Sequence, residues 1–338
     1  MHPSPQRTSG ASETTESGTR KKPRRGLRRA GIAAVVVLGL ILASTVINAI
    51  LESAEKSSVA AYGERIAVGS GALNVYRNGQ ENGQPIVLLS GLGTPAPGLD
   101  FAPLARELHG FDAIVVEGYG YGYSDMEAPP RTNENISNEL HEALTKLQLK
   151  KPYVLAGHSI AGFYMLDYAN RYPAEVSAVV GIDASISKAG DGPVPDPETG
   201  FNWQRALAVT GIVRAVSAAV PSFVDPASDD YTEDELHRMR LMTSWNYGNS
   251  AVADETARIA INAAALRGVA FPDDLPVLAF IADENPDSTA TKTAAAQNLL
   301  KNVKRHEIVT LEGNHYLHWT QSKRIAEEIR TFLRGNDG

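Results

Sequence analysis

Ser159 is the residue best placed to do chemistry in this chain. It lies in the segment GHSIAG, residues 157–162, between an apolar run at 153–156 and a helix-forming run at 163–168. A tight turn flanked by small residues strains the serine backbone and lifts its hydroxyl above a sheet, toward substrate and a histidine partner. We predict Ser159 as a nucleophile; the alternative is an incidental serine in the turn after a buried strand.

The elements that must position Ser159 follow a regular alternation. Apolar strand-like runs alternate with helical segments, which is the pattern of an α/β fold with a mostly parallel sheet. Two strands at 65–68 and 73–76 predict an opening hairpin. Further strands are expected at 86–89, 114–116, 153–156, 178–182, 277–281 and 307–311. Helices are expected at 101–108, 134–147, 160–171, 291–300 and 321–333.

From about Arg65 to its C-terminus the chain resembles the α/β-hydrolase fold family. The loop SGLG at 90–93 is similar to that family's oxyanion loop, with Ser90 in place of the usual histidine. The resemblance implies that the backbone N–H groups of Leu92 and Ile160 stabilise negative charge on a substrate oxygen. Segment 117–125 is similar to the family's Asp-x-x-Gly-x-Gly-x-Ser-Asp loop, with Glu117 replacing the first aspartate, and we interpret it as scaffold.

His315 is the predicted general base. It follows the last predicted strand on a glycine turn, LEGNHY at 311–316, and a group that titrates near neutral pH can take and return the serine proton. His318 is the competitor, although a packed or surface histidine is the commoner explanation there. His158 adjoins the nucleophile, so its side chain must point away, and we expect it to pack or hydrogen-bond.

The acid that would orient His315 has two candidates. In the family the acid most often follows the seventh strand, but Asn285 falls at that position here, and a neutral amide cannot stabilise imidazolium by charge. Asp183 ends the sixth predicted strand, where pancreatic-type lipases of the same fold carry their acid. We favour Asp183 and keep Asp283, which is two residues from the usual position, as the alternative.

Residues 187–271 interrupt the alternation and are predicted to form a helical cap over a core of residues 63–186 and 272–338. Helices are expected at 201–220 and 249–266, and the capping box Thr232-Glu-Asp-Glu opens another, short one. Aromatic and methionine side chains are expected to give the cap an apolar inner surface for an acyl group, or simply a small core. They are Trp203, Phe223, Met239, Met242, Trp245 and Tyr247.

The N-terminal region has a different composition. Residues 1–29 form a polar, basic tail expected to be disordered, and the apolar run 30–51 is long enough to cross a bilayer. The positive charge before the run predicts a single-pass cell-membrane protein with its N-terminus in the cytoplasm and its catalytic domain outside. Residues 52–62 are expected to be a linker. A cleaved signal peptide is the alternative, but no clear cleavage site follows the run.

The charge and composition of the chain limit which ligands and cofactors we expect it to bind. The first 30 residues hold eight Lys or Arg and two Glu, so with −7 overall the remaining chain carries −13 and opposes nucleic-acid phosphates. The chain has no cysteine, hence no disulfide. No metal-ligand cluster or dinucleotide loop is evident in the sequence, so we expect no metal and no cofactor. Nothing in the sequence indicates the oligomeric state.

The resemblance implies a serine hydrolase that cleaves a small-molecule or lipid-like ester through an acyl-enzyme. An aminopeptidase or carbon–carbon bond hydrolase of the same fold is the second hypothesis, with an anionic pocket from Glu117, Asp283 or Glu284. The third is a non-catalytic receptor or adaptor that retains the fold. Aspartate-nucleophile chemistry is disfavoured, because it needs a carboxylate where Ser159 stands.

Overall fold

The computed structural model describes residues 24–186, 196–197 and 200–335. Most of the predicted tail and part of the first cap loop lie outside these residues. The chain divides into a unit that ends at Ala43 and a larger one that begins at Ser44. Helix α1 (Arg24–Ser58) runs through both. The helix continues through residues 52–58, the first part of the predicted linker, with an ion pair of 2.6 Å between Glu52 and Lys56 at helical spacing.

The larger unit is built on one eight-stranded sheet in the order β1-β2-β4-β3-β5-β6-β7-β8. The predicted hairpin, β1 with β2, is antiparallel, as is the pairing of β2 with β4, and all other neighbours are parallel. The predicted α/β class is confirmed. The strands are β1 (Glu64–Val68), β2 (Gly71–Arg77), β3 (Gln84–Leu89), β4 (Phe111–Glu117), β5 (Tyr153–His158), β6 (Val176–Ile182), β7 (Val277–Asp283) and β8 (His306–Glu312).

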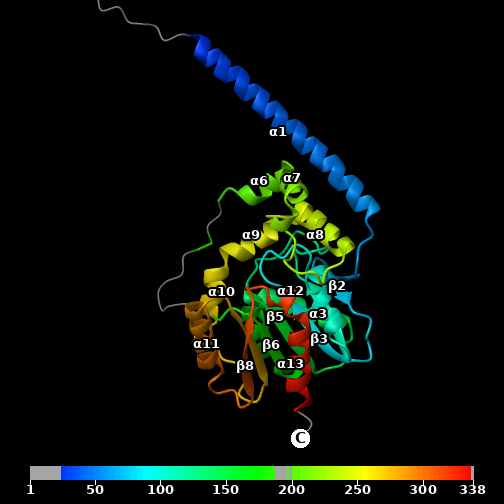
Figure 1. Cartoon of the computed structure of the whole chain (residues 1–338), viewed down its shortest axis with the longest axis vertical. Helices are drawn as coiled ribbons and strands as arrows, with labels where there is room; N and C mark the ends of the chain where they lie inside the picture. Colours follow the sequence, from blue (N-terminus) through cyan, green and yellow to red (C-terminus); the bar gives the residue numbers. More distant parts are fainter. Residues whose placement is uncertain (1–23, 187–195, 198–199, 336–338) are drawn as a thin grey trace, which may run out of the picture. The chain divides into compact units, whose positions relative to one another are not determined.

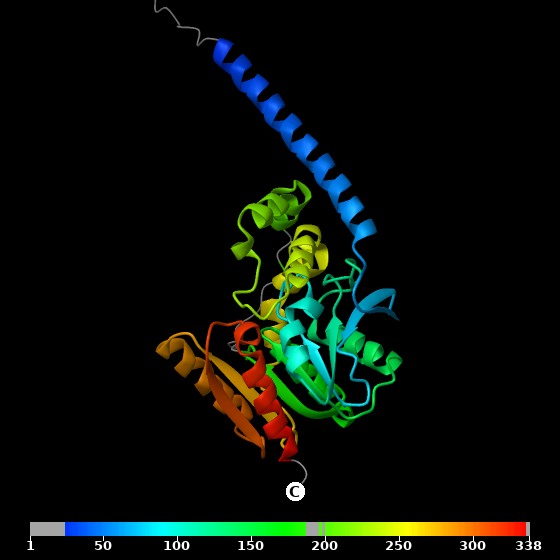
Figure 2. The ribbon, with the colours of Figure 1, turned by 45° about the vertical axis from the view of Figure 1, so that its right-hand side comes forward.

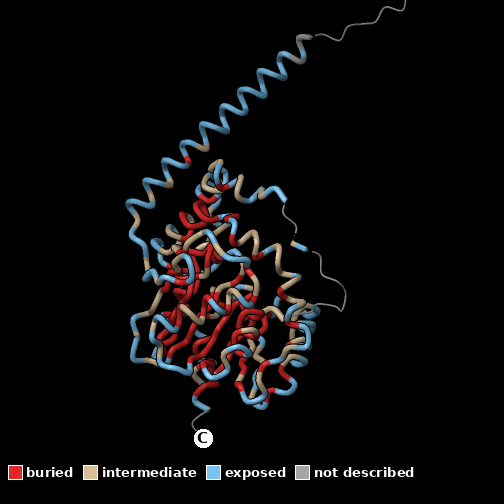
Figure 3. Tube along the Cα trace, turned by 180° about the vertical axis from the view of Figure 1, so that it is seen from behind, coloured by how far each residue is buried: buried red, intermediate tan, exposed pale blue. Residues whose placement is uncertain are grey.

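Helices cover both faces of the sheet (Figure 1). Alternate strand residues point to opposite sides, so Val87 packs in one apolar core and Leu88 in the other. One core joins the sheet to α4 (Asn133–Lys146), α5 (Ala161–Arg171) and α11 (Pro286–Leu300), and the other to α3 (Ala102–Glu107) and α13 (Ser322–Arg334). The central strands β3, β4, β5 and β6 are almost continuously buried, in the red interior of the tube (Figure 3). Short helical segments are α2 (Pro97–Asp100), η1 (Pro173–Glu175) and α12 (Leu317–Thr320).

The helices of the predicted cap lie beyond one end of the sheet in both views of the ribbon (Figures 1 and 2). Each of the two long helices expected there, at 201–220 and 249–266, is divided into two shorter helices. Gly211, at φ 80°, ends the first half of one, because this left-handed conformation suits glycine. The capping box at Thr232 is confirmed. The cap comprises α6 (Trp203–Val209), α7 (Ile212–Ala219), η2 (Pro221–Phe223), α8 (Glu233–Asn246), α9 (Ser250–Ala257) and α10 (Ile259–Ala265).

The apolar side chains of the cap do not share one surface. Met239, Met242 and Trp245 are buried in a small core with Leu99 of α2, as the simpler of our two interpretations predicted. Trp203 and Phe223, in contrast, are 72% and 76% exposed. The prediction that these two line an inner surface was therefore wrong.

Candidate active site

Ser159 occupies the turn between β5 and α5 with φ 54°, a conformation rare for a residue with a side chain. The turn is held by backbone hydrogen bonds: the N–H of Ser159 donates to the carbonyl of Ile182 over 3.3 Å, and the N–H of Ser185 donates to the carbonyl of Ser159 over 2.7 Å. Gly162 permits this closeness, because a Cβ there would lie 2.3 Å from the Ser185 carbonyl oxygen. The strain expected from the sequence is present and fixed by its surroundings.

Three side chains from distant parts of the chain form one hydrogen-bonded series. Ser159 Oγ lies 2.9 Å from His315 Nε2. His315 Nδ1 lies 2.6 Å from Asp183 Oδ2. With a proton on Nδ1 donated to the carboxylate, Nε2 is left as an acceptor for the serine hydroxyl, which is the arrangement that proton transfer from serine requires.

Asp183 is held in a polar niche at the carboxyl end of β6. Its Oδ1 accepts from the backbone N–H of Ala282 over 3.0 Å, and Lys292 Nζ donates to its Oδ2 over 2.7 Å. Burial raises the pKa of Asp183, but the hydrogen bonds from His315, Lys292 and Ala282 outweigh it and hold the pKa below its ordinary value. The carboxylate therefore stays charged beside the imidazole.

Lys292 was missed from the sequence. It lies on α11, more than a hundred residues from Asp183. The only local feature that could have drawn attention to it is that it is the one charged residue in its helical turn. Its Nζ also lies 3.5 Å from Glu284 Oε2.

The alternative acid is directed elsewhere. Asp283 is exposed and accepts from Thr289 Oγ1 over 3.0 Å, one helical turn into α11. Asn285 caps the same helix, its side chain accepting from the N–H of Ser288 over 2.9 Å. The structure thus brings Asp183 to His315 and gives Asp283 and Asn285 to the start of α11, where short polar side chains commonly bind the backbone.

The loop at 90–93 passes directly over the nucleophile. A Cβ on Gly91 would lie 3.3 Å from Ser159 Cβ and 2.7 Å from His158 Nδ1, so only glycine lets the backbone approach this closely. Leu92 follows in that loop, and Ile160 precedes the first residue of α5. Their backbone N–H groups remain the predicted donors to a substrate oxyanion, and the N-terminus of α5 adds a positive dipole beside Ser159.

The two other histidines lie behind His315. His158 donates from Nε2 to the backbone carbonyl of His315 over 2.9 Å. His318, fully buried, binds Asp100 with 2.8 Å between Nε2 and Oδ2. His318 is therefore bound to a different carboxylate, that of Asp100. His158 binds the backbone of His315, whose imidazole faces Ser159.

We expect His158→Gln to flatten the pH dependence of stability. Burial, with the nearby imidazoles of His318 and His315, lowers the pKa of His158 to about 3. A depressed pKa in the folded state means that this stabilisation is present above the unfolded value near 6.5 and is lost as pH falls from there toward 3. The loss runs to about 1.4 kcal/mol per pH unit.

Urea unfolding of the full chain in detergent, at about pH 7 and about pH 5, measures the effect. The wild-type protein should lose about 2 kcal/mol more than the variant over this interval. Equal losses would show that His158 does not titrate as its burial requires.

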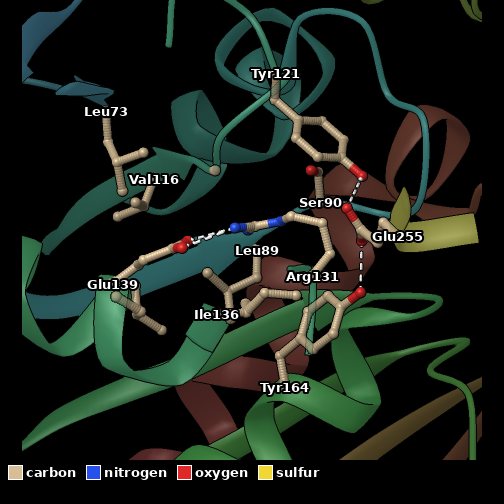
Figure 4. A pocket seen from close by; sticks show the side chains of 12 residues that line it. Leu73, Leu89, Ser90, Val116, Tyr121, Arg131, Ile136, Glu139, Tyr164 and Glu255 are labelled. Carbon is tan, nitrogen blue, oxygen red and sulfur yellow. Dashed lines mark hydrogen bonds and ion pairs between the residues drawn. The ribbon is translucent and has the colours of Figure 1, made fainter. Parts of the chain in front are cut away.

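A buried polar cluster joins Glu255 of the cap to Tyr121 and Tyr164 (Figure 4). Glu255 of α9 accepts from the hydroxyl of Tyr121 over 2.8 Å and from that of Tyr164. The same Tyr121 oxygen accepts from the N–H of Gly93 over 3.2 Å. Burial raises the pKa of Glu255, and the two hydroxyls partly oppose that shift. The oxyanion-like loop is thereby held through one tyrosine by a cap residue that the sequence did not single out.

A cavity of about 210 Å³ lies beside two of the three side chains of this series. Its wall includes both Asp183 and His315. The remaining lining is mostly apolar, from Ala184, Ser185, Ile186, Ile281, Lys292 and Ala295. The hollow beside His315 is therefore lined by apolar side chains together with the ion pair of Asp183 and Lys292.

Comparison with known proteins agrees with the observed fold. A family model described as "Alpha/beta hydrolase family" matches residues 86–328. The curated protein YbdG of Bacillus subtilis, named as uncharacterized, is 24% identical over 284 residues, which cover 80% of this chain and 86% of that protein.

Two solved structures illustrate the range of relatives with this fold. An epoxide hydrolase from Vigna radiata has a TM-score of 0.63 at 17% identity, covering 80% of this chain and 97% of its own. A structure titled as a membrane phospholipase A and bacterial virulence factor has a TM-score of 0.56 at 17% identity, covering 94% of this chain and 100% of its own. With the family model matching well over half of its length, this chain belongs to the α/β-hydrolase family.

Proposed function

We propose that this protein is a membrane-anchored serine hydrolase that cleaves a carboxylic ester through an acyl-enzyme. The observation that carries the proposal is the hydrogen-bonded series from Ser159 Oγ through His315 to Asp183. Nucleophile, base and orienting acid stand in the order and at the distances that acyl transfer needs.

In the first half of the reaction Ser159 Oγ attacks the ester carbonyl carbon, and its proton passes to His315 Nε2. The carbonyl oxygen becomes an oxyanion that accepts hydrogen bonds from the N–H groups of Leu92 and Ile160. Asp183 stabilises the imidazolium by charge and holds its orientation. The tetrahedral intermediate then collapses, the alcohol leaves with the proton from His315, and the acyl group stays on Ser159.

In the second half a water molecule takes the place of the alcohol. His315 accepts a proton from the water as it attacks the acyl carbon, and it returns the proton to Ser159 Oγ as the acid departs. The enzyme regains its starting state, and the net reaction adds one water across the ester bond.

The competing activities have weaker support. An amine-binding pocket would need a free carboxylate, yet Glu117 is fully buried and accepts from Asn74 Nδ2 and from the N–H groups of Gly98 and Tyr123. Glu284 lies beside Lys292 and Asp283 beside Thr289. Ser159 stands where an epoxide hydrolase or dehalogenase of this fold would carry its carboxylate. The hydrogen-bonded series of Ser159, His315 and Asp183 argues against a receptor without activity.

Helix α1 supports the membrane part of the proposal. Residues Arg28–Ser58 are long and apolar enough to cross a bilayer. The membrane phospholipase covers 94% of this chain, so the match extends beyond the hydrolase core. With Arg and Lys preceding the apolar run, we place the N-terminus in the cytoplasm and the catalytic domain outside the cell membrane. A lipid-like ester is the substrate class that this placement favours.

Tyr121→Phe should lower kcat by about tenfold, because Gly93 loses the acceptor that holds its N–H and the adjoining oxyanion donor at Leu92 is less well aimed. Stability should fall by about 1–3 kcal/mol, since buried Glu255 loses a donor. Steady-state kinetics on a soluble ester and urea unfolding measure the two effects.

Tyr164→Phe is the matched control. It removes the other hydroxyl from Glu255 without touching the 90–93 loop. Stability should fall by a similar amount while kcat changes less than about twofold. An equal loss of kcat in both variants would assign the effect to Glu255 and the cap rather than to Gly93.

Labelling with a fluorophosphonate tests the proposed activity. Full-length protein in detergent should react stoichiometrically, and mass spectrometry of the digest should place the adduct on Ser159. A series of nitrophenyl esters of increasing acyl length then defines the acyl preference. A well-folded sample that neither reacts with the probe nor cleaves any ester in the series would overturn the proposal.

A further inference from the structure

A short stretch of the cap carries six exposed large apolar side chains. We call them together the cap apolar face; they are Phe201, Trp203, Ile212, Val216, Val220 and Phe223, which are between 41% and 76% exposed. Within the described residues after α1, every exposed large hydrophobic side chain other than two tyrosines lies between 201 and 223. Such concentration in one short stretch marks an interaction site rather than scattered surface residues.

Residues 201–223 expose no unpaired charged side chain. Residues 201–223 contain no Asp or Glu and two arginines. Arg205 donates to the backbone carbonyl of Trp245 over 2.7 Å, and Arg214 donates to Asn48 Oδ1 over 2.7 Å and pairs with Glu55. Both guanidinium groups are therefore used within the protein, and the cap apolar face is left without a charged side chain.

Contacts with α1 indicate what covers this face. Ser44 Oγ donates to the carbonyl of Thr210 over 2.6 Å, and Asn48 Nδ2 donates to the carbonyls of Ala208 and Val209 over 3.2 and 3.3 Å. Ser44 and Asn48 belong to the apolar run 30–51, Ser44 about 10 Å before its end at helical rise. The junction of α6 and α7 thus binds a part of α1 that the membrane-spanning segment includes.

These observations together locate the cap apolar face at the boundary of the bilayer. A segment bound to the last turns of a spanning helix lies at the level of the lipid headgroups. Exposed Trp and Phe side chains are favoured there, because their rings are apolar and tolerate the interface.

We propose that the cap apolar face inserts into the lipid leaflet beside α1 and seats the cap at the surface from which the active site takes its substrate. This inference rests on the proposed membrane-anchored hydrolase for its substrate, but the insertion itself is independent of activity. The occupant is lipid, rather than a second copy of the chain, because the face is continuous with the helix segment that lies in the bilayer.

Single-cysteine labelling tests the insertion directly, because the chain has no native cysteine. Phe223→Cys and, as control, exposed Lys301→Cys at the end of α11 are labelled with a polarity-sensitive fluorophore in the full chain. Each is placed in nanodiscs with one chain per disc and lipids carrying a nitroxide at a shallow acyl position. The probe at 223 should be quenched at least about threefold more than that at 301.

Equal quenching at the two positions would overturn the inference. A second result would also overturn it: the probe at 223 is shielded from water, nitroxide lipid does not quench it, and position 223 cross-links to a second chain when each disc holds two chains. The cap apolar face would then be a dimer interface. Neither result depends on whether the protein hydrolyses esters.

A second measurement connects the surface to substrate supply. Replacing Phe201, Trp203 and Phe223 together by Gln should leave turnover of a water-soluble nitrophenyl ester within about twofold and lower turnover of an ester embedded in vesicles by about tenfold or more. A variant with Leu at all three positions keeps the face apolar and should retain most of the vesicle activity. Equal vesicle activity in the Gln and Leu variants would contradict a role in supply, whereas wild-type protein inactive on both substrates would instead contradict the proposed function.

Discussion

Ser159→Ala is expected to lower kcat/KM for any ester substrate by about 10⁵-fold or more and to abolish fluorophosphonate labelling. The hydroxyl removed is the one that lies 2.9 Å from His315 Nε2, and no covalent acyl-enzyme can form without it. The remaining activity would come from the backbone donors of the 90–93 loop and Ile160, which still polarise the carbonyl.

The variant should keep its fold, which makes the loss of activity interpretable. Alanine must adopt the same φ of 54° as serine, and the backbone hydrogen bonds that hold the turn do not involve the side chain. Near-UV circular dichroism and urea unfolding should match the wild-type protein within about 1 kcal/mol. Substantial turnover by a folded Ser159→Ala protein would exclude the acyl-enzyme mechanism.

Asp183→Asn is expected to lower kcat by about 10⁴-fold. An amide at this position keeps the shape but loses the charge that stabilises imidazolium, and its NH₂ group favours the wrong tautomer of His315. Asp183 also accepts from Lys292, so the variant leaves that cation with only Glu284 at 3.5 Å. Single-turnover kinetics with a nitrophenyl ester separate the loss in acylation from any change in binding.

Asp283→Asn is the matched control for this substitution. Its carboxylate is exposed and accepts from Thr289, so kcat should change less than about twofold, and stability by less than about 0.5 kcal/mol. Normal activity in Asp183→Asn with a large loss in Asp283→Asn would reverse our assignment of the acid and require a movement of the loop after β7.

The two acids show where sequence reasoning reached its limit. Strand order and the strand-end position of Asp183 could be read from the chain, but so could the similar position of Asp283. Which one meets His315 depends on the path of the loops after β6 and β7. The positive φ of 42° at Asp183 and its bond to the N–H of Ala282 set the side-chain direction, and neither is encoded in a local pattern.

The cap illustrates the same limit for apolar residues. The cap contains four large apolar side chains that look alike in the sequence. Trp203 and Phe223 are exposed, whereas Met242 and Trp245 are buried. Periodicity shows that a helix has an apolar face but not what that face meets. For Trp245 the partner is α2, and for α6 and α7 the bilayer is the occupant that we propose.

By itself the sequence determined the α/β alternation, the opening hairpin, the capping box at Thr232 and the candidate pair Ser159 and His315, because each depends on residues that are neighbours or follow a fixed local period. Only the tertiary structure placed Asp183 beside His315 and in contact with Lys292, linked Glu255 through Tyr121 to Gly93, and left the cap apolar face exposed. Those features join residues far apart in the chain, and the free energy that fixes them comes from packing and hydrogen bonding between elements, which no local pattern records.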